Sequence, residues 1–207
     1  MIFLAGVDEV GRGPLAGPVT ACCLVLKPTF DAQKLADSKE LSAEQRREYA
    51  SEIRANSLAL SVVSVGPRRI EQINILQASI LAMRHAILRV GRQLTILHGD
   101  DTFSLYILTD GNMRMESKFP NEPIVKGDKH IKVISAASIV AKVVRDDLAQ
   151  KLDTLYPGYG ISSHKGYATA FHREAVSTLG PSRVHRRTFA GVREFLQPPF
   201  IVSEASR

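Results

Sequence analysis

The chain has 207 residues, of which 44% are hydrophobic and 23% charged, and its formal net charge is +6 at pH 7. These values are typical of one folded domain and exclude a disordered or collagen-like chain. There is no run of about eighteen apolar residues and no basic segment before the short apolar N-terminus, so we expect no membrane span, no secretory signal and a cytoplasmic location. Cys22 and Cys23 are the only cysteines and are expected to be reduced core residues.

The first part of the chain is predicted to form an antiparallel start to a sheet. Apolar and β-branched runs predict three strands, at Ile2–Val7, Val19–Leu26 and Leu58–Val65. Between the second and third, Ser42 and Gln45 have the spacing of a capping box, which predicts a helix over Ser42–Arg54.

Helices and strands then alternate. Pro67 begins a helical region whose apolar spacing continues through Ile75–Val90, and we expect Gly91 to end it. Two shorter strands are predicted next, at Leu105–Leu108 and Pro123–Val125.

The C-terminal third is predicted to be helical. Ile131–Tyr156 lacks Gly and Pro and is followed by Pro157, so it predicts a long helix. Shorter helices are predicted at Gly166–Leu179 and Phe189–Leu196. We therefore expect an α/β domain over residues 1–197, with a mixed sheet flanked by helices and a C-terminal helical region, and a loose tail over 198–207.

The N-terminal segment joins an apolar run to the adjacent acids Asp8 and Glu9 and then to a Gly-Arg-Gly turn. A regular strand would send the two acids to opposite faces, but the glycines and prolines that follow predict a turn, so both acids can converge. Two carboxylates followed by glycines, which let a backbone come close, could hold a divalent cation beside a bound phosphate or sugar.

Two phosphate-binding loops can be rejected for the same segment. A Walker loop requires Lys and Ser/Thr where Arg12 and Gly13 stand. A dinucleotide-binding loop requires a following helix, whereas Val19–Leu26 is strand-like.

Four acids each follow an apolar strand: Asp8, Glu9, Asp110 and Asp128. If the first and fourth strands are neighbours in a mixed sheet, these acids can meet at one edge. Such a cluster is tolerated mainly when cations neutralise it, and all-oxygen ligands select Mg²⁺ or Mn²⁺. Two ions about 4 Å apart stabilise an in-line displacement at phosphorus, which points to phosphodiester hydrolysis.

Basic residues are predicted to surround the acids: Arg12, Lys39, Lys126, Lys142, Lys165 and the stretch Arg183–Arg187. Together they suit a nucleic-acid backbone. Each alone also fits a solvated surface charge, and Lys142 with Asp146 fits a local ion pair. His164 could shuttle protons near a metal site, or be a surface residue.

The chain resembles prokaryotic ribonuclease HII over Gly6 to Phe189, in a set of motifs that occur in order. They are Gly6–Pro18 (GVDEVGRGPLAGP), Asp37-Ser-Lys39, Asp110-Gly111, Lys126-Gly-Asp128, Ser135–Lys142 (SAASIVAK) with Arg145-Asp146, Tyr156-Pro157, His164–Tyr167 (HKGY), and His185-Arg186 with Phe189.

The resemblance implies a ribonuclease H-like fold and an endonuclease that cuts the RNA strand of RNA/DNA hybrids, including a lone ribonucleotide in duplex DNA. Cleavage would fall 5′ of the ribonucleotide and leave 3′-hydroxyl and 5′-phosphate ends, as ribonucleotide removal and primer removal require. Asp8, Glu9, Asp110 and Asp128 would hold two Mg²⁺ or Mn²⁺ ions. Asp100 and Asp101 are rivals for the third ligand, but Asp110 ends the better strand.

The same resemblance implies how the substrate is bound. Gly11, Arg12 and Gly13 would sense the ribose 2′-hydroxyl through backbone atoms, and Tyr167 would stack on the following sugar and favour deoxyribose. The other substrate contacts implied are Lys39, which would hold a phosphate, Ser138, Lys142 and Lys165. We expect a monomer, and a sliding-clamp contact is an open alternative.

Two other functions remain open from the sequence. A related metal-dependent nuclease or strand-transfer enzyme that ignores the sugar would keep the carboxylates. A non-catalytic, basic hybrid-binding module would need none of them.

Overall fold

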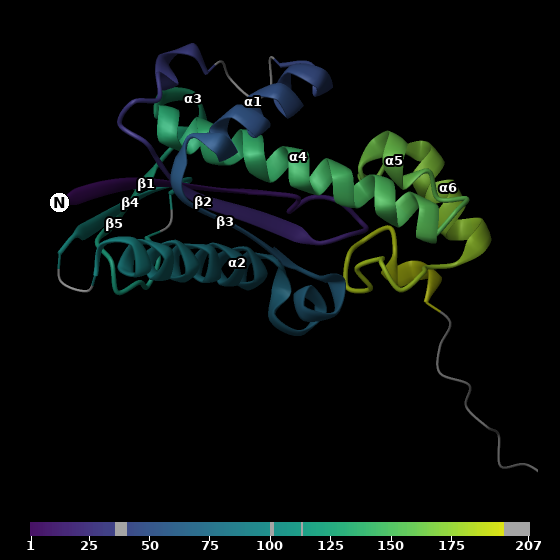
Figure 1. The fold of residues 1–207 in the computed structure, drawn as a ribbon. Coiled ribbons are helices and arrows are strands. Elements are labelled where there is room, and N and C mark those ends of the chain that lie inside the picture. The colour runs from purple at the N-terminus through teal and green to yellow at the C-terminus, as the bar shows by residue number, and fades with distance from the viewer. Residues whose placement is uncertain (36–40, 100–101, 113, 197–207) are drawn as a thin grey trace, which may run out of the picture.

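The computed structural model describes residues 1–35, 41–99, 102–112 and 114–196 (Figure 1). In these ranges five strands form one sheet in the order β3-β2-β1-β4-β5. The strands are β1 (Ile2–Val10), β2 (Val19–Leu26), β3 (Ser57–Val65), β4 (Ser104–Asp110) and β5 (Asn121–Ile124). β1, β2 and β3 pair antiparallel, whereas β1, β4 and β5 pair parallel. The predicted mixed sheet is confirmed, and the first and fourth strands are neighbours, as a meeting of the acids requires.

Helices cover both faces of this sheet (Figure 1). The α-helices are α1 (Ala43–Ala55), α2 (Pro67–His98), α3 (Gly127–His130), α4 (Lys132–Leu155), α5 (Ile161–His164) and α6 (Ala170–Leu179), and the 3₁₀ turns are η1 (Ala32–Lys34) and η2 (Arg193–Phe195). α2 lies on one face, and α4 with α1 lies on the other. No helix in the described ranges is long and apolar enough to span a membrane.

The sheet separates two hydrophobic cores because successive side chains of a strand point to opposite faces. Ala5, Val7 and Cys23 lie in the core under α2, and Cys22 lies in the core under α4. Both cysteines are buried and free, as predicted, and burial raises the pKa of each thiol.

Most predicted elements are found near their predicted bounds. The capping box before α1 is present: the Ser42 hydroxyl accepts the backbone N–H of Gln45 at 3.1 Å, and the Gln45 side chain accepts that of Ser42 at 2.9 Å. α4 matches the long predicted helix within one residue at each end.

The prediction that Gly91 ends a helix is wrong. α2 continues through Gly91 to His98, and its irregular residue is Asn74, which has a φ of 63°. Gly91 is needed for space, because a Cβ there would lie 2.6 Å from the ring of Phe119. The helix packs against Phe119 at the position where the sequence indicated a stop.

Two C-terminal helix predictions also need correction. α6 begins at Ala170 and not at Gly166, because Lys165 and Gly166 have positive φ values and the Thr169 side chain caps the helix instead. Only the turn η2 is found within the helix predicted at Phe189–Leu196. The predicted tail at 198–207 lies outside the described residues, and the single-domain assignment stays a prediction.

Candidate active site

The acids Asp8 and Glu9 lie inside β1, so the predicted turn at this point is wrong. β1 continues to Val10, and Asp8 and Glu9 pair with Cys22 and Ala21 of β2. Since Val7 belongs to the core under α2, the alternation puts Asp8 on the α4 side and Glu9 on the opposite side.

Asp110 lies beside Asp8 at the end of β4. Val7 pairs with Thr109 in the parallel β1–β4 ladder, so Asp8 and Asp110 are the next residues of their strands. They are on the same face, because Leu108, two residues before Asp110, packs against the core under α4. Asp100 and Asp101, the rival candidates, lie outside the described residues.

Asp128 is brought to Asp110 by α3 and not by a strand end. Lys126 has a left-handed backbone with a φ of 56°, and Asp128 follows in the first turn of α3. The Asp128 backbone N–H donates to Asp110 Oδ1 at 3.2 Å, and the Asp128 carbonyl accepts the Ser135 hydroxyl of α4. Asp128 is 7% exposed.

The acids form an electrostatically coupled, negatively charged group. Asp8 is 6% exposed, and its Oδ1 accepts the Glu9 N–H at 2.7 Å. Burial raises the pKa of Asp8 well above its usual value, the charges of Glu9 and Asp110 raise it further, and a hydrogen bond from Ser138 opposes the rise. Burial also raises the pKa of Glu9, although Arg12, 3.5 Å away, lowers it.

This donor set fits a hard divalent cation. Its side chains offer carboxylate oxygens, and a cation would relieve the repulsion that raises the pKa of Asp8. Within the described ranges, however, no three acidic, histidine or cysteine side chains are grouped closely enough to form a ready metal site. The acids are neighbours whose side chains do not form a closed ligand set.

The loop Gly11–Gly13, called the glycine loop, follows Asp8 and Glu9 and is stabilised by hydrogen bonds from Arg186. This guanidinium donates to the carbonyls of Gly11 at 2.6 Å, Arg12 at 2.7 Å and Gly17 at 3.0 Å. Gly11 has a φ of 95°, and a Cβ there would lie 2.2 Å from Nε of Arg145. A side chain at Gly11 is therefore excluded by backbone conformation and by space.

Arg186 corrects the prediction that the whole stretch Arg183–Arg187 is a phosphate-binding surface. Arg186 is fully buried, and burial, assisted by the charge of Arg145, lowers its pKa to about 9. Arginine in a basic run is most often exposed, so no signal in the sequence marked this residue as a support of the loop.

Arg145 joins the glycine loop to Tyr167. Its Nη2 donates to the Lys165 carbonyl at 2.9 Å, and its Cζ lies 5.9 Å from the centre of the Tyr167 ring. A Cβ on Gly13 would lie 3.5 Å from the same ring, which is half exposed. Arg145 is buried, and Nε and Nη1 have no partner in the described structure. The structure thus brings Gly11, Gly13 and Tyr167 together.

Two lysines that were predicted to contact substrate, Lys142 and Lys165, contact other groups of the protein in this structure. Lys142 Nζ lies 2.6 Å from Asp146 Oδ1, which is the local ion pair considered from the sequence. Lys165 Nζ donates to the Ser162 carbonyl. Ser138 lies on α4 and contacts Asp8, and Lys39 lies outside the described residues.

His164 is held by backbone groups. Its Nε2 pairs with the Tyr159 carbonyl at 2.9 Å, and its Nδ1 accepts the Gly166 N–H at 3.2 Å. With both ring nitrogens engaged, the structure gives no support to a proton shuttle and gives His164 a role in packing the C-terminal region.

The fold is that of a ribonuclease H-like protein. The structure is similar to ribonuclease H2 from Pyrococcus horikoshii OT3, with a TM-score of 0.72 at 24% identity, covering 93% of this chain and 96% of that one. It is similar to RNase HII in the PCNA:RNase HII complex from Archaeoglobus fulgidus, with a TM-score of 0.73 at 23% identity, covering 95% and 98%. Bst-RNase HIII in complex with Mn²⁺ gives a TM-score of 0.74 at 17% identity, covering 93% and 68%.

Sequence comparison assigns the family. The family model Ribonuclease HII matches residues 5–192. Ribonuclease HII of Syntrophotalea carbinolica is 42% identical over 193 residues, which are 93% of this chain and 88% of that protein. The chain belongs to the ribonuclease HII family. It is accordingly a ribonuclease H, an endonuclease of a family that acts on RNA/DNA substrates and depends on divalent metal ions.

Proposed function

We propose that this enzyme nicks duplex DNA 5′ of a single embedded ribonucleotide and hydrolyses the RNA strand of longer hybrids, leaving 3′-hydroxyl and 5′-phosphate ends. Asp8, Glu9, Asp110 and Asp128 are the catalytic acids. The observation that carries the proposal is the adjacency of Asp8 and Asp110 in the β1–β4 ladder, with the Asp128 N–H on Asp110. The activity suits ribonucleotide removal and primer removal in the cytoplasm.

These four acids are the residues that would hold two Mg²⁺ or Mn²⁺ ions. When bound, such ions activate the attacking water and stabilise the charge that develops at phosphorus. Ser138 orients the Asp8 carboxylate by its hydrogen bond, and Ser135 fixes the backbone of Asp128. The chain itself therefore orients the Asp8 carboxylate and fixes the backbone of Asp128.

Selection of ribose is assigned to the backbone of Gly11, Arg12 and Gly13. The carbonyls of Gly11 and Arg12 already accept hydrogen bonds from Arg186. We therefore assign contact with the 2′-hydroxyl to the backbone N–H groups of this loop and to the Gly13 carbonyl. Lys142 and Lys165 contact phosphates once their present partners, Asp146 and the Ser162 carbonyl, are exchanged for substrate. Lys39, which lies outside the described residues, is proposed to hold a further phosphate.

Tyr167 is assigned to the sugar that follows the ribonucleotide. Its ring is half exposed and lies beside Gly13, where a bound strand would pass. An aromatic face stacks well on a deoxyribose, and a 2′-hydroxyl would be crowded against it.

The enzyme is proposed to act as a monomer. One structural relative is described as a PCNA:RNase HII complex, which supports a sliding-clamp contact as a hypothesis for this chain.

The direct test is nicking of a duplex that carries one ribonucleotide. The pure enzyme should cut it 5′ of the ribonucleotide when Mg²⁺ or Mn²⁺ is present and should lose this activity in EDTA. Equal cutting of an all-deoxyribonucleotide duplex would favour the nuclease that ignores the sugar.

Asp110→Asn tests the catalytic acids. Replacing one carboxylate oxygen by an amide should reduce the nicking rate by orders of magnitude while the duplex still binds. Ser117→Ala, in the loop before β5, is a matched control that should keep the wild-type rate. An Asp110→Asn enzyme that nicks at the wild-type rate would contradict the role given to Asp110.

Tyr167→Ala should mainly reduce cleavage at isolated ribonucleotides, because only there does a deoxyribose follow the ribonucleotide. The check is the ratio of kcat/KM on a single-ribonucleotide duplex to that on a long hybrid. Equal loss on both substrates would contradict the junction-sensing role.

A further inference from the structure

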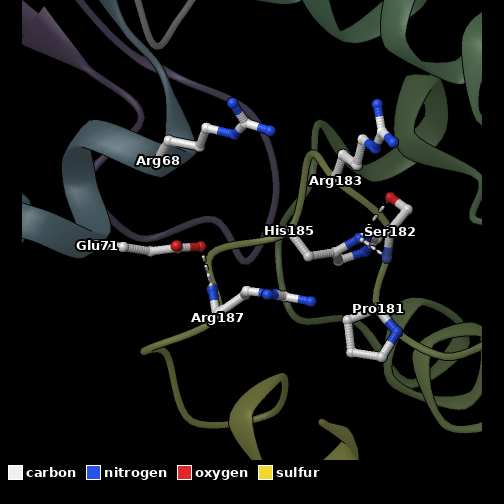
Figure 2. A pocket seen from close by; sticks show the side chains of 7 residues that line it. All are labelled: Arg68, Glu71, Pro181, Ser182, Arg183, His185 and Arg187. Carbon is white, nitrogen blue, oxygen red and sulfur yellow. Dashed lines mark hydrogen bonds between the residues drawn. The ribbon is translucent and has the colours of Figure 1, made fainter. Parts of the chain in front are cut away.

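A second basic site lies between α2 and the segment 181–187. It is a pocket of about 320 Å³ (Figure 2). Its lining residues are Arg68, Glu71, Pro181, Ser182, Arg183, His185 and Arg187. None of them belongs to the group of acids, the glycine loop or the surroundings of Tyr167. We call it the arginine pocket.

The arginine pocket carries excess positive charge. Three guanidinium groups line it against one carboxylate, that of Glu71, which accepts the Arg187 backbone N–H at 3.0 Å (Figure 2). In the described structure the side chains of Arg68, Arg183 and Arg187 make no hydrogen bond or ion pair, and each is exposed. Three unpaired cations around one cavity repel each other, so an anion would stabilise the arrangement.

His185 does not add to this charge. Its Nδ1 accepts both the N–H and the hydroxyl of Ser182, at 3.1 and 2.9 Å. Burial, followed by the charge of His172, lowers its pKa to about 4, so it is neutral at pH 7. The pocket is therefore basic because of its arginines alone.

The backbone of the arginine pocket is joined to the segment that directly follows the glycine loop. Ala16 forms a β-bridge with His185, and the Gly17 N–H donates to the Val184 carbonyl at 2.9 Å. The side chain of Arg186 reaches the Arg12 carbonyl, while the next residue, Arg187, lines the pocket. The pocket is thus about one arginine side chain away from the loop proposed to sense the ribose.

We infer that the arginine pocket binds a phosphodiester group of the same duplex, displaced along it from the nicked bond. The inference rests on the proposed function for the identity of the duplex. A guanidinium offers paired N–H donors that match two phosphate oxygens, and contacts to backbone phosphates position a duplex without reading its sequence. The pocket fixes the register in which the ribonucleotide reaches the acids.

A phosphate of the duplex fits better than an acidic segment of a protein. The segment that carries Arg183 and Arg187 is joined to the glycine loop through the side chain of Arg186, so a strand bound at that loop passes close to the pocket. The pocket also has few apolar walls that would anchor a peptide: Pro181 is its only hydrophobic residue in the described structure.

The test measures duplex binding in EDTA, so that no strand is cut. The full-length enzyme and the variant Arg68→Gln/Arg183→Gln/Arg187→Gln are titrated with a single-ribonucleotide duplex over a series of KCl concentrations. Each phosphate contact contributes about 0.9 to the slope of log K against log[salt], so the triple variant should lose about 0.9 and bind roughly tenfold more weakly. Arg92→Gln, an exposed arginine near the other end of α2, should keep the wild-type slope.

Neutral methylphosphonates placed one at a time in each strand identify the occupant. At one position or an adjacent pair, neutralisation should weaken wild-type binding about tenfold and leave the triple variant unchanged. Additive losses at every position, or an unchanged salt slope in the triple variant, would overturn the inference.

Two further measurements distinguish duplex binding from binding of a free anion and from a folding defect. If inorganic pyrophosphate binds the wild type and not the triple variant, while duplex affinity is equal for both, the pocket holds a free anion and the inference is wrong. If the triple variant has a lower Tm than the wild type, the binding measurements are repeated with Arg187→Gln alone. This single variant keeps the backbone hydrogen bond from Arg187 to Glu71. Nicking by the wild-type enzyme in Mg²⁺ is measured in parallel. If the pocket does not bind the duplex but nicking is observed, only the inference about the pocket is wrong. If nicking fails, the binding measurements still test the pocket.

Discussion

Arg186 illustrates how one buried side chain can shape a loop that is proposed to bind substrate. Its three donors fix the carbonyls of Gly11, Arg12 and Gly17, which lie about 170 residues earlier in the chain. A buried carbonyl left without a donor costs about 1–3 kcal/mol. The guanidinium therefore stabilises the fold and orients the loop at the same time.

Arg186→Lys should lower both stability and activity. A lysine has a single nitrogen and cannot reach three separated carbonyls, so we expect a loss of about 2–4 kcal/mol in the free energy of unfolding, measured by urea denaturation. The nicking rate should fall even at temperatures where the variant is folded. Arg187→Lys, at the exposed neighbour, should change stability by less than about 0.5 kcal/mol. Equal stability of the two variants would contradict the role given to Arg186.

At this scale the sequence predicted candidate residues but not their surroundings. Asp8, Glu9, Asp110 and Asp128 could be selected because each follows an apolar run. Glu9, however, stays on the opposite side of β1 from Asp8, since β1 continues to Val10 and not only to Val7 as expected. The burial of Arg145 and Arg186 could not be predicted, because it depends on contacts between segments far apart in the chain.

At the scale of elements, α2 depends on a glycine that looks like a stop signal. Gly91 is buried inside the helix against Phe119. Glycine within a helix costs about 1 kcal/mol relative to alanine, so the close packing of the ring must offset that cost. Local helix propensity predicted that the helix ends at Gly91, whereas tertiary packing against Phe119 keeps Gly91 inside the helix.

Gly91→Ala tests this balance. Propensity alone would stabilise the variant by about 1 kcal/mol, but the new methyl group would meet the Phe119 ring, and overpacking costs about 1–3 kcal/mol. We expect a net loss of stability in thermal denaturation. In the background Phe119→Leu the same change should become stabilising. A stabilised single variant would refute the role given to packing.

Three histidines connect α5, α6 and the segment before Arg186. The rings of His164 and His172 stack at 4.3 Å, and Nε2 of His172 lies 3.1 Å from Nε2 of His185. The His172 Nδ1–H donates to the Tyr167 carbonyl, so its Nε2 accepts from His185, whose Nδ1 in turn accepts from Ser182. This chain of hydrogen bonds requires the rings of His172 and His185 to be neutral.

Stability should therefore fall in acid. Burial lowers the pKa of His185 to about 4, against 6.5 when unfolded, and it also lowers the pKa of His172. Between pH 4 and pH 6.5 the unfolded chain binds more protons than the folded chain. The stability that the neutral histidines contribute is therefore complete above pH 6.5 and is lost as the pH falls toward 4. His185→Gln should lose less stability than the wild type between pH 7 and pH 4.5 in urea denaturation. His85→Gln, at an exposed site on α2, should follow the wild type, and parallel curves for all three proteins would contradict this assignment.

At the scale of the whole molecule, topology assembles the site. Parallel pairing of β1 with β4 brings residues about a hundred positions apart side by side, and α3 adds Asp128 through its backbone. The sequence predicted a mixed sheet from its pattern of strands and helices, and it left the neighbouring of the first and fourth strands as a condition. The sequence could not predict that the left-handed backbone of Lys126 and the first turn of α3 place Asp128 beside Asp110. This backbone conformation depends on close packing of α3 against α4.

The most direct test of the account is a crystal structure of the enzyme with a single-ribonucleotide duplex in Mn²⁺, with the ions located by anomalous scattering. We predict two ions, with oxygens of Asp8, Glu9, Asp110 and Asp128 within about 2.5 Å of them, at the nicked phosphate. Ions bound elsewhere, or Asp110 and Asp128 remote from any ion beside the scissile bond, would contradict it.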